Sequence, residues 1–121
     1  MNLSHALSAT APVTVLRLEG RLDWAAASQV EQFADRRRQG HVDDAGLLLD
    51  LRALDFCDSL ALGVLVSLAQ YERQAGRELV VFGLRPPVRR VLEMVRLHDW
   101  FLLFDDCEPA LRWLAPVSAG A

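Results

Sequence analysis

Residues 47–51 read Leu-Leu-Leu-Asp-Leu, a short and nearly continuous apolar run near the middle of the chain. Such a run is typical of a central strand that is covered on at least one side. A loop is predicted over residues 52–58, and a helix from Leu60 to Ala75, with Gly76 in the position that commonly ends a helix. Because apolar residues lie almost all round the first half of this helix, we expect it to be largely buried.

The segments on either side alternate between strand and helix patterns. Strands are predicted over 13–19, 78–82 and 100–104, with a very short strand at 21–22. A helix of about four turns follows Asp23, its expected N-cap, and its apolar face is formed by residues 26, 30, 33, 34 and 37. A third helix opens at Pro86-Pro87, and a short last helix carries residues 110–114. This order implies an α/β domain with several parallel strands, and an antiparallel N-terminal strand would make the sheet mixed.

The length of 121 residues fits one domain that can bury a core without a disulfide or a metal. We expect a flexible N-terminal arm over 1–11, the domain over 12–114 and a disordered tail over 115–121. No apolar run is long enough for a membrane span, and the N-terminus lacks the pattern of a secretory signal. We therefore expect a cytoplasmic protein that does not insert into a membrane.

The charged residues exclude some chemistries. All 13 residues counted as Lys+Arg are Arg, so neither a Schiff-base lysine nor a P-loop lysine is available. A formal net charge of −3 argues against nucleic acid as a partner. The two Cys and three His lack the spacing of metal ligands, so neither a metal nor another cofactor is predicted.

Ser59 stands where the central helix should begin, in the loop Phe56-Cys57-Asp58-Ser59. Strand-to-helix loops of this kind collect ligand and partner sites in open α/β sheets. From residue type alone, the favoured interpretation of Ser59 is a helix N-cap. The same position would also let the hydroxyl accept a phosphate, because free N–H groups and the helix dipole stabilise added negative charge.

Four motifs along the chain together resemble one known family. They are Gly20-x-Leu22-Asp23, Leu47-Leu-Leu-Asp-Leu-x4-Phe56-x-Asp58-Ser59-x-x-Leu62-Gly63-Val64-Leu65, Gly76-x-x-Leu79-x-Val81 and Val88-x-x-x-Leu92-x-x-x-x-Leu97-x-x-x-Phe101. The ordered set resembles the STAS family, the domain of anti-sigma factor antagonists and of sulphate-transporter tails. The resemblance covers about residues 12–114.

The resemblance implies a small mixed sheet of about four or five strands packed with about four α-helices. It also implies binding instead of catalysis. The partner would be an anti-sigma factor that is also a serine kinase, and a serine phosphatase would reverse the modification. Carried over, the phosphorylated residue is Ser59, and Asp58 and Asp23 lie beside it on the partner-binding surface. The alternative is a non-phosphorylated STAS adaptor or accessory module of a transporter or signalling complex.

The residues after Ser59 depart from the family pattern, which usually has Ser, Thr or Gly and then Gly. Here Leu60 and Ala61 occupy those places. Leu60 could shield the serine hydroxyl or anchor a partner, and we include it among the expected partner-binding residues. Although Asp58 and Ser59 are adjacent, no recognised motif places a His as a base beside them, so catalysis is not expected.

Arginines occur at both ends of predicted helices. Arg85, Arg89 and Arg90 begin the third helix, where cations oppose the helix dipole, so we expect them to face an acidic partner. The run 36–38 suits the end of the first helix and is predicted to be solvated. The three Trp residues at 24, 100 and 113 are predicted to pack in the core or at its edge in preference to anchoring an interface.

Overall fold

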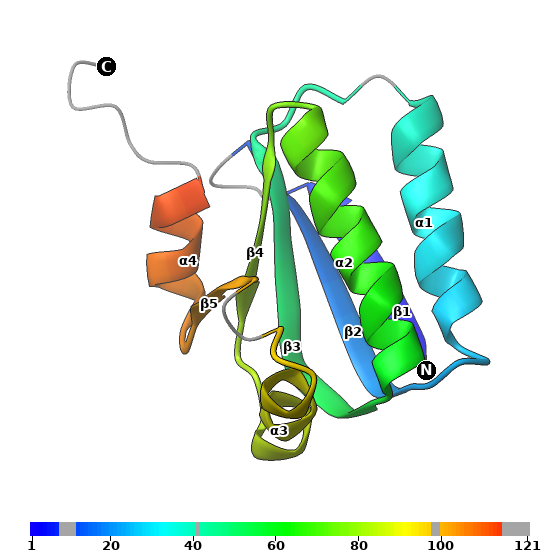
Figure 1. Cartoon of the computed structure of the whole chain (residues 1–121). Helices are drawn as coiled ribbons and strands as arrows, with labels where there is room; N and C mark the ends of the chain where they lie inside the picture. Colours follow the sequence, from blue (N-terminus) through cyan, green and yellow to red (C-terminus); the bar gives the residue numbers. More distant parts are fainter. Residues whose placement is uncertain (8–11, 41, 98–99, 115–121) are drawn as a thin grey trace.

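The computed structural model describes residues 1–7, 12–40, 42–97 and 100–114, which form one sheet and four helices (Figure 1). The strands are β1 Asn2–Leu7, β2 Thr14–Leu22, β3 Gly46–Cys57, β4 Glu78–Phe82 and β5 Leu102–Phe104. The helices are α1 Ala27–Gln39, α2 Ser59–Gln74, α3 Pro86–Met94 and α4 Cys107–Leu114. The prediction of a mixed α/β fold with these proportions is confirmed.

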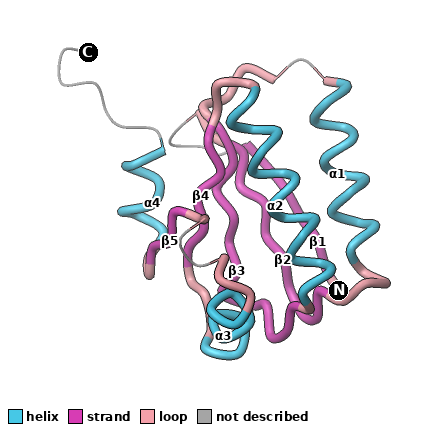
Figure 2. The backbone as a smooth tube through the Cα atoms, in the orientation of Figure 1, coloured by secondary structure: helices cyan, strands magenta, loops and turns pink. Residues whose placement is uncertain are grey.

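The strand order in the sheet is β1-β2-β3-β4-β5, the order of the chain. β1 runs antiparallel to β2, and every later pair is parallel. Successive parallel strands are joined through α1, α2 and α3, so each crossover returns the chain to the same end of the sheet. Figure 2 shows α1 and α2 over one face of the sheet and α4 beside β4 and β5.

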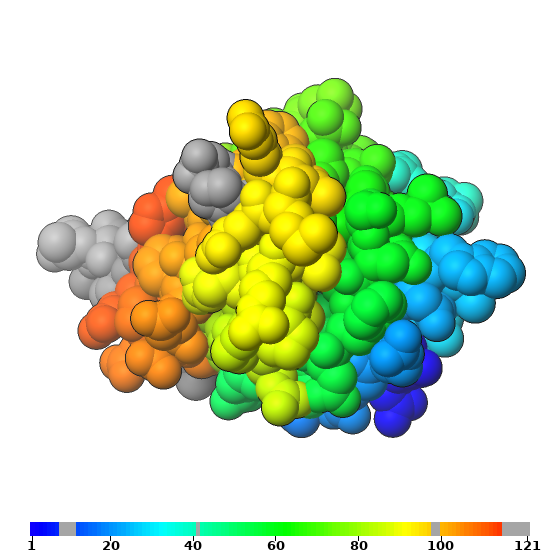
Figure 3. Space-filling model, turned by 60° about the horizontal axis from the view of Figure 1, so that its bottom comes forward, coloured from blue at the N-terminus to red at the C-terminus, as the bar shows by residue number. Residues whose placement is uncertain are grey.

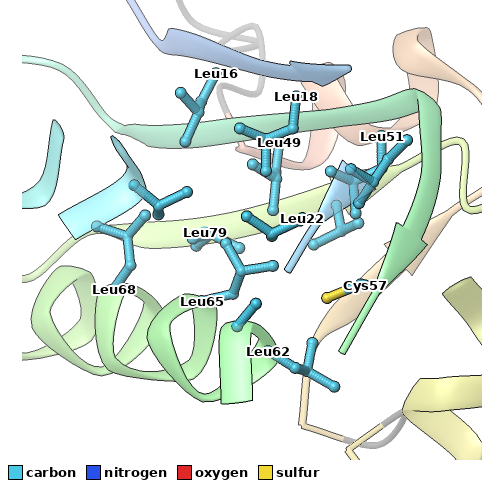
Figure 4. Close-up of a cluster of buried hydrophobic side chains, with 14 of the residues drawn as sticks. Leu16, Leu18, Leu22, Leu49, Leu51, Cys57, Leu62, Leu65, Leu68 and Leu79 are labelled. Atoms are coloured by element: carbon cyan, nitrogen blue, oxygen red, sulfur yellow. The ribbon is translucent and has the colours of Figure 1, made fainter. Parts of the chain in front are cut away.

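Alternate residues of β3 enter two separate hydrophobic clusters. Leu47, Leu49 and Leu51 pack with α1, α2 and α3, whereas Leu48 packs with α4 on the opposite face. Leucine fills most of the larger cluster, as Figure 4 shows for side chains of β2, β3, β4 and α2. This alternation explains why the apolar run in β3 is nearly continuous, because both of its faces are covered there.

Three predictions about the strands are wrong. Residues 2–7 of the expected flexible arm form β1, because the edge of β2 offers free backbone groups to a strand with little apolar pattern of its own. The loop expected over 52–58 is the second half of β3, which stays paired with β2 as far as Cys57. The expected core strand 100–104 is only β5, three half-buried residues at a sheet edge. The rest of the arm and the predicted tail lie outside the described residues.

Arg37 is buried, although we expected the arginines of 36–38 to be solvated. Its side chain leaves the last turn of α1 and donates to Glu72 Oε1, at 2.9 Å from Nε, and to both carboxylate oxygens of Asp44. Glu72 is fully buried in α2 and also accepts from Arg77 at 2.8 Å. Burial by itself would lower the pKa of Arg37, but these carboxylates outweigh it and raise that pKa. The cluster ties α1 to α2 at the end of the sheet away from Ser59.

Within the described part of the chain, no helix is long and apolar enough to cross a membrane.

Candidate functional site

The starts of α1, α2 and α3 meet at one end of the molecule, where β2, β3 and β4 end. Figure 3 shows this end, with α3 in yellow next to the green start of α2, and the blue segment that precedes α1 beyond it. The backbone N–H of Asp58, the residue after β3, donates to the carbonyl of Leu22, the last residue of β2, at 3.1 Å. The fold therefore brings the end of β2 and Asp23 beside the Asp58-Ser59 pair, as the resemblance implied.

The N-cap of α2 is Asp58 and not Ser59. Asp58 has extended backbone angles, and its Oδ1 accepts the N–H of Ala61 at 2.7 Å. Its Oδ2 accepts the N–H of Trp24 at 2.9 Å, in the turn before α1. One carboxylate thus binds two segments that lie 34 residues apart. The prediction that Ser59 caps the helix is wrong, because α2 begins at Ser59 itself, one residue earlier than a serine cap would require.

Ser59 is the first residue of α2, and its side chain is exposed. Its hydroxyl has no hydrogen-bond partner among the residues that the structure describes. Leu60 is 67% exposed and points away from the core, so it leaves the hydroxyl accessible, whereas Ala61 is fully buried. The helix dipole and the N–H groups of the first turn favour negative charge at this position.

We expected α2 to be largely buried, but one side of its first half is exposed. Its buried face holds Leu62, Leu65 and Leu68, but Leu60 and Gly63 lie on a solvent-exposed side. An apolar residue that is exposed at the start of a helix, next to a free hydroxyl, can contact a partner without any change in the core.

Asp23 stabilises a turn instead of capping α1. Its Oδ1 and its carbonyl both accept the N–H of Ala26, and α1 begins only at Ala27, without a side-chain cap. This turn carries Trp24, whose side chain is 71% exposed. The prediction that Trp24 packs in the core or at its edge is therefore wrong.

The three arginines at the start of α3 differ in their surroundings. Arg85 forms an ion pair with Asp55 of β3, and Arg89 lies 3.7 Å from a carboxylate oxygen of Asp105. Arg90 is exposed, and no ion pair to it is found among the described residues. The chain itself thus supplies two of the acidic groups that we expected from a partner, and Asp55 could have been found from its place near the end of a parallel strand.

Cys57 is a buried core residue. Burial raises the pKa of its thiol to about 12, with the charge of Asp58 as a smaller cause, so the thiolate does not form at neutral pH. Its Sγ donates weakly to the carbonyl of Asp58 at 3.4 Å. No group of His, Cys, Asp and Glu in the described ranges could hold a metal ion. The site is therefore a surface of hydroxyl, carboxylate and apolar groups.

The sequence matches a known protein family and a relative of similar length. The STAS domain family model matches residues 6–110. An anti-sigma F factor antagonist of Paenibacillus polymyxa is 32% identical over 122 residues, which cover 98% of this chain and all of that protein. The chain belongs to the STAS domain family.

Solved structures show the same fold. The unphosphorylated anti-sigma factor antagonist SpoIIAA has a TM-score of 0.72 at 23% identity, covering 89% of this chain and 90% of that chain. The phosphorylated Bacillus SpoIIAA has a TM-score of 0.67 at 22% identity, covering 89% and 94%.

Proposed function

We propose that this protein is an anti-sigma factor antagonist that binds an anti-sigma factor with serine kinase activity, and that phosphorylation of Ser59 switches this binding off. The Paenibacillus relative supports the antagonist role, because it is named for that activity and aligns over 98% of this chain and all of its own. The kinase partner, a phosphatase that restores Ser59 and a place in the cytoplasm are parts of the same proposal.

The observation that carries the proposal is the free hydroxyl of Ser59. Because Asp58 caps α2, the serine is not needed for the helix, and its exposed side chain is open to a kinase. A cap serine would have to break its hydrogen bond to the backbone before it could react, at a cost of about 1 kcal/mol. At the first position of α2 the hydroxyl of Ser59 has no such bond to break.

The switch works through charge at the interface. Phosphorylation adds about −1.5 to −2 charges at neutral pH. If the partner places a carboxylate ~4 Å from the phosphate, repulsion at an effective dielectric constant near 20 is on the order of 4 kcal/mol for each pair of unit charges. That energy is roughly a thousandfold in affinity, and it requires no refolding of α2.

The partner-binding surface that we propose surrounds Ser59. It includes Asp23 and Asp58, the exposed side chain of Leu60, and the three arginines of α3, Arg85, Arg89 and Arg90. Arg90 is the arginine that we expect to contribute most to a partner, because Arg85 and Arg89 already face carboxylates of the chain.

The test is a phosphorylation assay with anti-sigma factor kinases cloned from the organism that encodes this chain. With ATP and the cognate kinase, the wild-type chain and Ser67→Ala should each gain one phosphate by mass spectrometry, whereas Ser59→Ala should gain none. Ser67 is the matched control, since it is exposed on the same helix. We also expect Ser59→Asp to bind the kinase more weakly than Ser67→Asp does. Equal phosphorylation of Ser59→Ala would contradict the proposal.

A second candidate rests on the residues after Ser59. Leu60 and Ala61 replace the small residues usual in the family, which fits a non-phosphorylated adaptor of a transporter or signalling complex. Co-purification of the chain with transporter subunits, together with an unmodified Ser59, would favour this candidate.

A further inference from the structure

Trp24 is exposed at a place where a hydrogen bond fixes its backbone. It lies in the turn between β2 and α1, with 71% of its surface accessible to solvent. Its N–H donates to Asp58 Oδ2 at 2.9 Å. An indole held out by a fixed backbone loses little conformational freedom on binding, and Trp is enriched among the residues that dominate interface energies.

Asp58 connects this turn to the start of α2. Its other carboxylate oxygen accepts the N–H of Ala61 at 2.7 Å, and the next two side chains along the chain are those of Ser59 and Leu60. Trp24 and Leu60 are two of the six large apolar residues that are strongly exposed in the described part of the chain. The carboxylate of Asp58 accepts the N–H of Trp24 and that of Ala61, the residue after Leu60, so both apolar side chains belong to the surface around Ser59.

We propose that Trp24 and Leu60 form an apolar anchor pair for the anti-sigma factor, and that Asp58 is the positioning residue that makes the Trp24 turn respond to the state of Ser59. This inference rests on the proposed function. The surface of the anti-sigma factor that contacts Trp24 would then be an apolar pocket large enough for an indole, next to the part of the kinase that binds Ser59.

The coupling follows from the charges on neighbouring residues. A phosphate on Ser59 places about −1.5 to −2 charges one residue away from the carboxylate of Asp58. Repulsion between the two anions favours movement of the carboxylate, and the phosphate oxygens compete with it for N–H groups of the first turn of α2. The N–H of Trp24 then loses its acceptor, and the turn is released. Phosphorylation would therefore weaken binding both by repulsion and by loosening the aromatic anchor.

The coupling can be tested on the chain alone, without a kinase. Phosphoserine is inserted genetically at position 59 or, as the control, at position 67, and hydrogen exchange of the Trp24 backbone amide is measured by NMR. We expect phosphate at 59 to speed exchange about tenfold, the factor that one hydrogen bond to a charged acceptor supplies. Phosphate at 67 should leave the rate unchanged.

A variant separates the two roles of Asp58. In Asp58→Ser the hydroxyl can still cap α2 through Ala61, but no second oxygen remains for Trp24. We expect fast exchange at Trp24 in this variant, while the amides of α2 keep their protection. If Trp24 exchanges at the wild-type rate both in Asp58→Ser and with phosphate on Ser59, the inference is overturned, whatever any kinase does.

The anchor itself is tested by affinity for the kinase that modifies Ser59. Trp24→Ala should weaken binding by about tenfold or more, as expected for a hot-spot aromatic residue. Trp113→Ala is the matched control, since Trp113 is 47% exposed on α4 and away from this end of the molecule. Equal affinity of the two variants would overturn the inference. Failure of the proposed function gives a different result, in which wild-type protein is neither bound nor modified by an anti-sigma factor kinase.

Discussion

Replacing Glu72 with Gln should destabilise the fold far more than its conservative size suggests. Glu72 Oε1 accepts from Arg37 Nε at 2.9 Å, and Oε2 accepts from Arg77 Nη2 at 2.8 Å, with the side chain fully buried. Glutamine retains one acceptor oxygen and turns an NH₂ donor toward the other guanidinium. Removing one charge from a buried ion pair costs about 3–5 kcal/mol, because the remaining charges stay buried without full compensation.

Urea unfolding followed by circular dichroism measures this loss. We expect the midpoint to fall without a change in the m-value, and thermal unfolding to drop by roughly 10–20 °C. The control is Asp35→Asn, which removes the exposed partner of Arg38 in α1 and should cost at most about 1 kcal/mol. A loss for Glu72→Gln no larger than that of the control would refute the reasoning. Replacing Glu72, both of its arginine partners and Asp44 with apolar residues should recover part of the loss, because no charge of the cluster then stays buried without a partner.

Three further outcomes follow from other residues. Hydrogen bonds from Arg37 and Thr14 outweigh burial and hold the pKa of Asp44 below its usual value. The stabilising effect of Asp44 is therefore complete above the usual carboxyl pKa and is lost as the pH falls below it. In Asp44→Asn, the free energy of unfolding should fall less steeply as the pH is lowered through this range. Ellman's reagent at pH 8 should modify the exposed Cys107 and leave Cys57 unmodified until the chain is unfolded, because burial raises the thiol pKa of Cys57 to about 12. Gly46→Ala should destabilise the fold, since its Cβ would lie 2.0 Å from a backbone oxygen of β4. Gly63→Ala, on the exposed side of α2, should stabilise the fold by up to about 1 kcal/mol. The urea midpoint of each variant, compared with that of the wild type, measures both effects.

The helices were predictable because one apolar face sufficed to define each of them. The buried residues of α1 are Ala27, Val30, Phe33, Ala34 and Arg37, nearly the positions that periodicity selects. Periodicity nevertheless predicts only which residues of a helix are buried, and not which residues they contact. Arg37 falls on the buried face, and it pairs with one carboxylate seven residues away, that of Asp44, and with another 35 residues away in α2. Helix-end arginines are usually solvated, so only the tertiary structure could reveal this burial.

The strand limits were less predictable because pairing overrides local pattern. β1 contains Asn, Ser and His, and it forms since the edge of β2 would otherwise leave backbone groups unpaired. β3 continues past Leu51 through residues whose pattern is typical of a loop, because its buried residues Leu51, Leu54 and Cys57 are three positions apart. The pairing of β3 with β2 shifts register twice in this part, so the alternation that identifies a strand in the sequence is lost there.

Trp24 shows how an anchor can escape detection in a sequence. Its large apolar side chain favours burial, yet it lies outside the apolar stripe of α1, which begins with Ala26 and Ala27. A large aromatic residue outside the periodic face, in a turn at the carboxyl end of a parallel strand, is therefore a better candidate for a partner contact than for the core.

The adjacent residues Asp58 and Ser59 divide two tasks that one serine could not perform together. A serine that caps a helix has its oxygen bonded to a backbone N–H, and that bond must break before the oxygen can react. With Asp58 as the cap, the oxygen of Ser59 carries no hydrogen bond of α2, and the helix dipole favours a phosphate at that position. The cost is a permanent negative charge beside the modified residue. That charge gives the site its sensitivity, because any phosphate must compete with the carboxylate that also holds Trp24.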